Sequence, residues 1–222
     1  MTKKERVLAV MKKEQVDMIP AGFWFHYKSD YTVQQMIDEH MKLFRTTDMD
    51  IIKIMQDYPY PISGKITCAD DWYHIQVKGT DSEEFAKMAE IIRGIRKEAG
   101  KDVLIFQTMF GPFKAASMIF GDDVLMKYSK EAPEAVVAGV KIIADALEEW
   151  TKGYLEAGAD GIYYSAQFGE IGRFEKNEWE ELVRPYDLQI LKVAEEMPEK
   201  YNILHICGEP EYQFETHVEW FK

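Results

Sequence analysis

Residues 202–208 contain the side chains in this chain that are best suited to hold a metal ion. They read Asn-Ile-Leu-His-Ile-Cys-Gly, an apolar, strand-like run that places His205 and Cys207 two positions apart. Because alternate side chains of a strand point to the same face, the two can reach one ion together. An imidazole and a thiolate are two of the three protein ligands that a catalytic zinc site uses. The pattern predicts a zinc site whose third ligand the sequence leaves open. The plainer alternative is two packed core residues, since a free cysteine behaves as a small hydrophobe.

Polar side chains also stand at the carboxyl ends of the other expected strands. They are His26, Asp57, Gln107, Ser165 and Gln167. The carboxyl ends of parallel strands meet at one edge, so these groups are expected to line a common pocket with His205. Each also has a structural interpretation: Asp57 precedes Tyr58-Pro59 and suits a turn, and the others suit backbone hydrogen bonds at strand ends. The aromatic run 23–25 is expected to belong to the core.

Buried strands and amphipathic helices alternate along the chain and must position these groups. The expected strands are 19–25, 50–55, 102–110, 160–166 and the segment that carries His205. The expected helices are a short one opened by the capping pair Thr2 and Glu5, then 33–44, 83–98, the long apolar stripe 136–154, and one capped by Asn177 with Glu180 that Pro185 splits or kinks. Residues 58–79 contain two prolines and two glycines and are expected to form an irregular excursion or a hairpin.

Apolar strands separated by amphipathic helices predict an α/β fold with a parallel sheet. An open doubly wound sheet and a closed eight-stranded barrel both satisfy the pattern. No glycine-rich phosphate turn follows the first expected strand, and the polar groups gather at strand ends, so a (β/α)8 TIM barrel is favoured. Five strands are expected, which makes this barrel incomplete, and residues 1–222 are expected to form a single domain.

Composition narrows the class of protein further. The chain carries 27 Lys plus Arg against 39 Asp plus Glu, a formal net charge of −12, so a nucleic-acid partner is not expected. Its two cysteines, Cys68 and Cys207, are too few for a disulfide framework. No apolar run approaches the length of a membrane span, and the amino terminus lacks the features of a signal peptide. A cytoplasmic protein with a small-molecule substrate is expected.

Three segments carry a resemblance to a known family. They are Arg6-Val-Leu-Ala-Val-Met with Asp17-Met-Ile-Pro-Ala-Gly-Phe-Trp-Phe-His26, Glu156-Ala-Gly-Ala-Asp-Gly-Ile, and Leu204-His-Ile-Cys-Gly208. In this order they resemble the uroporphyrinogen decarboxylase superfamily, and within it the zinc-dependent methyltransferases that act with corrinoid proteins. The resemblance implies a TIM barrel of which this chain is the amino-terminal two-thirds.

The methyltransferase resemblance implies a reaction and a set of site residues. His205 and Cys207 would bind zinc with a later cysteine that this sequence lacks. Glu209, His217 or a residue of a partner chain are the candidate replacements. Zinc would hold a substrate thiol as its thiolate, which attacks a methyl group on a corrinoid carried by a partner protein. Asp57, His26, Ser165 and Gln167 would line the pocket as catalytic residues.

Two alternatives remain open. A uroporphyrinogen-III decarboxylase of porphyrin and heme biosynthesis would grip its substrate with arginines after the first strand, where this sequence has only Lys28. The family's strand-two aspartate corresponds to Asp57 and its strand-four serine to Ser165, but its tyrosine corresponds to Met118. The second alternative is a non-catalytic remnant that depends on a partner. An incomplete barrel exposes a strand edge and apolar helix faces, so a homo-oligomer is expected.

Overall fold

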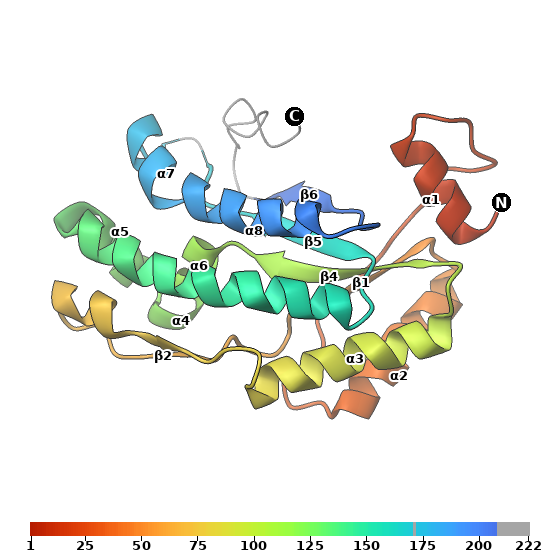
Figure 1. Ribbon diagram of the computed structural model, residues 1–222, viewed down its shortest axis with the longest axis horizontal. Helices are drawn as coiled ribbons and strands as arrows, with labels where there is room; N and C mark the ends of the chain where they lie inside the picture. The colour runs from red at the N-terminus through yellow and green to blue at the C-terminus, as the bar shows by residue number, and fades with distance from the viewer. Residues whose placement is uncertain (171, 208–222) are drawn as a thin grey trace.

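A computed structural model describes residues 1–170 and 172–207 (Figure 1). Its helices are α1 (Lys3–Met11), α2 (Val33–Thr47), η1 (Ala69–His74, a 3-10 helix), α3 (Glu83–Ala99), α4 (Pro112–Phe120), α5 (Asp122–Glu131), α6 (Pro133–Glu156), α7 (Lys176–Leu182) and α8 (Arg184–Glu196). Its strands are β1 (Ile51–Ile54), β2 (Ile62–Ser63), β3 (Gln76–Val77), β4 (Leu104–Phe110), β5 (Gly161–Ala166) and β6 (Ile203–Ile206). No helix within these residues has the length and apolar character needed to cross a membrane.

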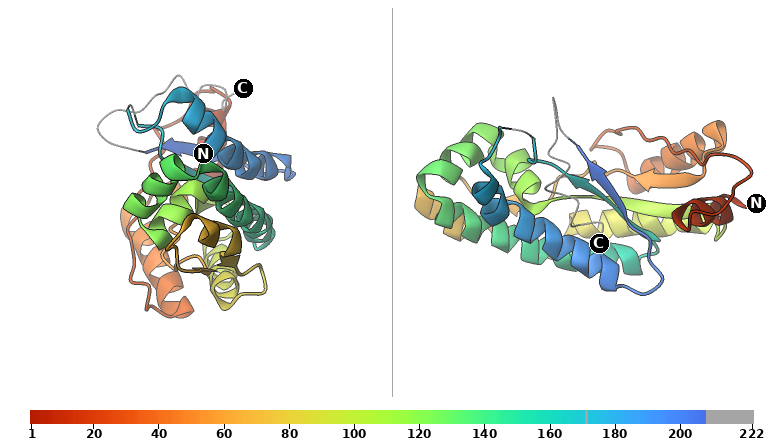
Figure 2. Two further views of the ribbon diagram at one scale, coloured as in Figure 1. Left: turned by 90° about the vertical axis from the view of Figure 1, so that its left-hand side faces the viewer. Right: turned by 90° about the horizontal axis from the view of Figure 1, so that it is seen from above.

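The main sheet is parallel, with the strand order β1-β4-β5-β6. One face packs against helices: Ile52 and Ile105 point into a core shared with Ile92 of α3 and Val140 of α6. Figures 1 and 2 show α3, α6 and α8 running alongside the strands as an outer layer. The sheet is thus an arc of a β/α barrel, as the alternation of buried strands and amphipathic helices predicts.

Helix α1 closes the amino end of the opposite, inner face of the sheet. Thr2 and Glu5 form the expected capping box at its start. Val7 packs against Leu104, Phe106 and Tyr163, which are inward-facing residues of β4 and β5. The inner face is therefore covered by α1 at one end and left open toward the carboxyl ends of the strands.

The excursion and the split helix confirm two further predictions. In residues 58–79, β2 and β3 pair antiparallel on either side of η1. Pro185 stands in the first turn of α8, immediately after α7 ends. The prediction that Asn177 with Glu180 caps the helix before it is wrong, because the N-cap is Glu175, which forms a capping box with Glu178. Helices α4 and α5 lie in a region for which the sequence patterns predict no element.

The prediction of a strand at 19–25 is wrong. This segment is extended and lies beside β1. Among the described residues, one backbone hydrogen bond joins it to the chain at the start of β1, from Asp50 N–H to Ala21 O at 2.8 Å. Pro20 has no N–H to donate. The Asp50 carboxylate takes the place of a ladder partner by accepting from Ala21 N–H at 2.9 Å. The described sheet accordingly has four strands where five were expected.

Arg6 fixes this segment to the base of the sheet. Its guanidinium pairs with Asp17, with Nε 2.6 Å from Oδ1, and with Asp50. These contacts hold the pKa of Asp17 well below its usual range, chiefly through the hydrogen bond from Arg6. The aromatic run is not core, because Phe23 is 52% and Phe25 62% exposed.

Asp187 of α8 is a buried carboxyl group behind the sheet. Its Oδ1 accepts a hydrogen bond from the Tyr164 hydroxyl at 2.7 Å, and Oδ2 has no hydrogen-bond partner among the described residues. A Cβ at Gly111, the N-cap of α4, would lie 2.2 Å from Oδ1, so only glycine fits there. Burial raises the pKa of Asp187 to about 7, although the Tyr164 hydrogen bond acts to lower it.

Asp187→Asn is expected to change how stability depends on pH. A carboxyl group whose pKa is raised in the folded state contributes most to the free energy of unfolding at pH values below its unfolded pKa of about 4. This contribution is lost as the pH rises through the folded pKa of about 7. Between about pH 4 and pH 8 the free energy of unfolding of the wild type should therefore fall by up to about 4 kcal/mol relative to that of Asp187→Asn. Urea denaturation of both proteins across this range measures the difference. Parallel stability curves would contradict the assignment.

Candidate functional site

The parallel register brings four strand ends to one cavity on the inner face. Ser165 of β5 is in register with His205 of β6, and Lys53 of β1 with Phe106 of β4. Beyond these positions the strands enclose a cavity of about 410 Å³. It is lined by Trp24, His26, Lys53, Met55, Thr108, Phe110, Lys114, Met118, Ser165, Gln167, His205 and Cys207. Five of the seven site residues predicted from the sequence lie in this lining, and Asp57 and Gln107 do not.

His205 of β6 and Cys207, the residue after the strand ends, both line the cavity. The His205 ring lies 5.5 Å from the Tyr163 ring and 6.5 Å from the Trp24 ring, measured between centroids. Burial, reinforced by the nearby Lys53 charge, lowers the pKa of His205. Just past the end of β6, Cys207 N–H donates to Ala166 O at 2.9 Å, so the ladder also fixes the cysteine backbone.

Lys53 is the site residue that the sequence analysis missed. It is 5% exposed, and its Nζ lies 3.8 Å from the ring centroids of both Trp24 and Tyr163. Burial lowers the pKa of Lys53 to about 8, with Cys207 acting in the opposite direction. The available signal was a single lysine within the apolar run Ile51–Ile54, because a charge is seldom fully buried without a partner.

Asp57 lies behind the cavity and positions His26. Its Oδ1 is 2.8 Å from His26 Nδ1, and its Oδ2 accepts from Tyr27 N–H at 3.0 Å. The Asp57 side chain is 4% exposed, whereas that of His26 is 71% exposed at the cavity. Asp57 itself is absent from the cavity lining. The carboxylate therefore fixes the end of the 19–27 segment.

Ser165 and Gln167 form a small polar pair on the cavity wall. Gln167 Nε2 donates to Ser165 Oγ at 3.4 Å. Gln107 has a different place, because its side chain is fully buried on the helix side of the sheet. There its Nε2 donates to Gln56 Oε1 at 3.2 Å. Gln107 therefore belongs to the packing between the sheet and the helices.

The described residues do not complete a zinc site. His205 and Cys207 supply two suitable ligands, but no group of three His, Cys, Asp or Glu side chains within residues 1–170 and 172–207 is placed to hold a metal. Glu209 and His217 lie outside the described residues. Lys53 also places a positive charge beside the pair. A catalytic zinc ion needs three protein ligands, so the described residues alone do not hold one.

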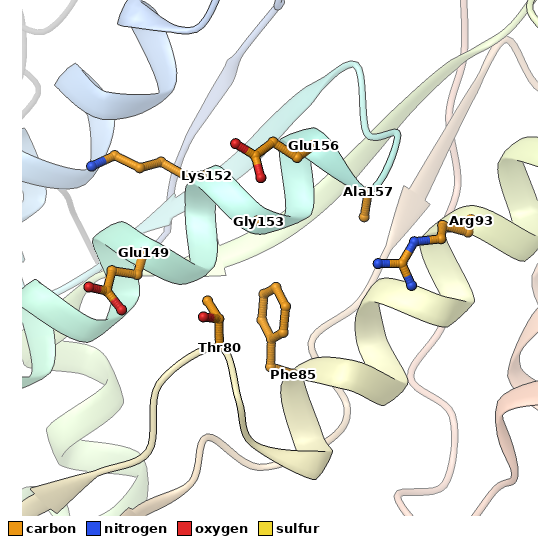
Figure 3. A pocket seen from close by; sticks show the side chains of 8 residues that line it. All are labelled: Thr80, Phe85, Arg93, Glu149, Lys152, Gly153, Glu156 and Ala157. Atoms are coloured by element: carbon orange, nitrogen blue, oxygen red, sulfur yellow. The ribbon is translucent and has the colours of Figure 1, made fainter.

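A second cavity, of about 540 Å³, lies in the helix layer between α3 and α6 (Figure 3). Phe85 lies beneath Gly153, where a Cβ would come within 2.3 Å of the Phe85 ring. Arg93 points toward the groove from α3, and Glu149, Lys152 and Glu156 project from α6. The charges are of both signs, and the strand-end residues are absent from the lining. This cavity is a groove of the outer layer.

The parallel arc and the cavity at its carboxyl edge define the class of β/α-barrel proteins that carry their site on the strand ends. The sequence model of the uroporphyrinogen decarboxylase (URO-D) family matches residues 48–219. The chain belongs to this family.

A methyltransferase from Methanosarcina mazei is similar in structure. Its TM-score is 0.73 at 16% sequence identity, and the match covers 100% of this chain and 73% of that chain. The similarity confirms the α/β barrel fold expected from the sequence. No match was found among curated protein sequences.

Asp57→Ala is expected to loosen the segment that carries His26. Removing the carboxylate leaves Tyr27 N–H without its acceptor and His26 without its partner. The free energy of unfolding should fall by about 1–3 kcal/mol. Amide exchange should also rise at residues 23–27.

The matched control is Asp38→Ala. Asp38 is an exposed carboxylate that accepts from Gln34 one helical turn away, at 2.8 Å. Its removal should change stability by less than about 0.5 kcal/mol. Equal effects of the two substitutions would show that Asp57 does not anchor the segment.

Proposed function

We propose that this protein is a methyltransferase that moves a methyl group from a corrinoid, carried by a partner protein, to a thiol bound in the inner cavity. His205 and Cys207 are two ligands of a zinc ion in this proposal. The third ligand comes from outside the described residues. When bound, zinc supplies the stabilisation of the acceptor thiolate.

One observation carries the proposal. The imidazole of His205 and the thiol of Cys207 open side by side into a cavity at the carboxyl ends of the strands, in a chain of the URO-D family. The cavity volume of about 410 Å³ is suited to a small substrate. The side chains of Met55, Phe110 and Met118 give the same space an apolar wall for the carbon frame of a substrate.

Porphyrinogen decarboxylation has less support from this cavity. No arginine is among the described lining residues, and Arg is the side chain suited to bidentate recognition of carboxylates. Met118, at the position of the family's tyrosine, does line the cavity and cannot donate a hydrogen bond. Asp57, the family's charge-stabilising aspartate, is committed to His26 and Tyr27.

The proposed reaction can be measured with methylcobalamin as donor and a small thiol as acceptor. Methyl transfer should be detected as loss of the methylcobalamin absorbance with formation of the thioether. His205→Ala and Cys207→Ser should each lower the rate by about 100-fold or more, because each removes a group from the reacting centre. His74→Ala and Cys68→Ser are the controls, since His74 is on η1 and Cys68 is exposed.

A wild-type rate equal to the background reaction would argue for the non-catalytic, partner-dependent alternative. So would a rate that His205→Ala and Cys207→Ser leave unchanged.

The metal is tested separately by elemental analysis of the purified protein. About one zinc per chain is expected, falling by 10-fold or more in His205→Ala and unchanged in His74→Ala. Zinc far below one equivalent in the wild type, or equal content in the two variants, would remove zinc from the proposal.

A further inference from the structure

Lys53 holds a buried positive charge that has no carboxylate partner among the described residues, and the Cys207 thiol is the acidic group that acts on it. Its side chain is nine-tenths or more buried, and within residues 1–170 and 172–207 its Nζ forms no hydrogen bond or ion pair. Two aromatic faces, those of Trp24 and Tyr163, cover the ammonium at 3.8 Å. A cation–π pair stabilises the charge but accepts no conventional hydrogen bond. The three N–H groups of the ammonium therefore keep their capacity to donate.

Two lysines, Lys53 and Lys114, line the cavity among mostly apolar and neutral side chains. Lys114 projects into it from α4, and His26 and His205 line two other walls. No aspartate or glutamate is among these lining residues. The whole chain has a formal net charge of −12, so the charge of this cavity is opposite in sign to that of the protein as a whole. A concave site of one sign with low-dielectric walls concentrates ligands of the opposite sign.

We propose that the inner cavity is a binding site for a small organic anion, whose oxyanion head group accepts hydrogen bonds from the Lys53 ammonium. Lys114 supplies a second positive charge at the wall, and the Ser165 hydroxyl a neutral donor. The apolar part of the ligand packs against Met55, Phe110 and Met118. The assignment rests on charge and burial alone, so it holds whether or not the protein transfers methyl groups.

The chemistry of the site favours a singly charged head group such as a carboxylate. Lys53 is the one ammonium enclosed on the inner face among the described residues, whereas Lys114 is only partly buried on α4. Charge-assisted hydrogen bonds to a desolvated ammonium are about twice as strong as neutral ones. Replacing the anion by its neutral isostere should leave Lys53 without an acceptor of equal strength. The site should therefore distinguish a carboxylate from the matching amide.

The experiment is calorimetric titration of the protein with benzoate and with benzamide, which share one carbon frame. Benzoate should bind at least about 10-fold more tightly than benzamide. Benzenesulfonate and phenylphosphonate extend the series and identify which oxyanion the site prefers. Lys53→Met should lower benzoate affinity by about 10-fold or more and leave benzamide affinity unchanged. Lys53→Arg, which keeps the charge, should restore part of the preference.

Lys152→Met is the matched control. Lys152 is a lysine of the outer groove, paired with Glu148 at 2.7 Å, and its removal should leave benzoate binding unchanged. Lys53→Met takes away a buried charge and leaves no described group without its partner, so the variant is expected to fold.

Equal affinity for benzoate and benzamide in the wild type would overturn the proposal without any variant. An undiminished benzoate preference in Lys53→Met would overturn it as well. Neither result depends on catalytic activity, so failure of the anion site is distinguishable from failure of the proposed methyl transfer.

Discussion

The parallel register of β1, β4, β5 and β6 is the constraint on which the site depends. Alternate residues of each strand point to opposite faces, so one register sends isoleucines toward the helices and sends Lys53, Ser165 and His205 toward the cavity. A shift of one residue in β6 would turn His205 and Cys207 toward α8. The apolar side chains packed against the helices therefore fix the register, and the register in turn positions the polar side chains on the opposite face.

The segment before α2 shows how charged side chains can replace a strand ladder. Arg6 binds Asp17 and Asp50, Asp50 binds Ala21, and Asp57 binds Tyr27. These few contacts hold the chain beside β1 and bring Trp24 over the Lys53 ammonium. The same ring forms part of the cavity wall, so carboxylates at both ends of β1 shape the site without lining it.

The sequence predicted the central elements because their signals are local and strong. The stripe from Val136 to Tyr154 and the apolar runs of β4 and β5 leave few alternatives, and the spacing of His205 and Cys207 was enough to place both on one face. The segment 19–25 was misjudged because its apolar content matches a strand, whereas its backbone finds carboxylate partners from distant residues. Lys53 was missed since its two aromatic neighbours come from other segments, and no local pattern reveals them.

Cys207 opens into a cavity that Lys53 makes cationic, and the alkylation rates of the thiol report this charge. With a chelator present, iodoacetate and iodoacetamide deliver the same carbon to a thiol as an anionic and a neutral reagent. The ratio of the iodoacetate rate to the iodoacetamide rate, measured by mass spectrometry, is expected to be higher at Cys207 than at exposed Cys68, and this difference should be lost in Lys53→Met. A Cys207 that does not react in the folded protein, or that shows the same ratio as Cys68, would contradict the account.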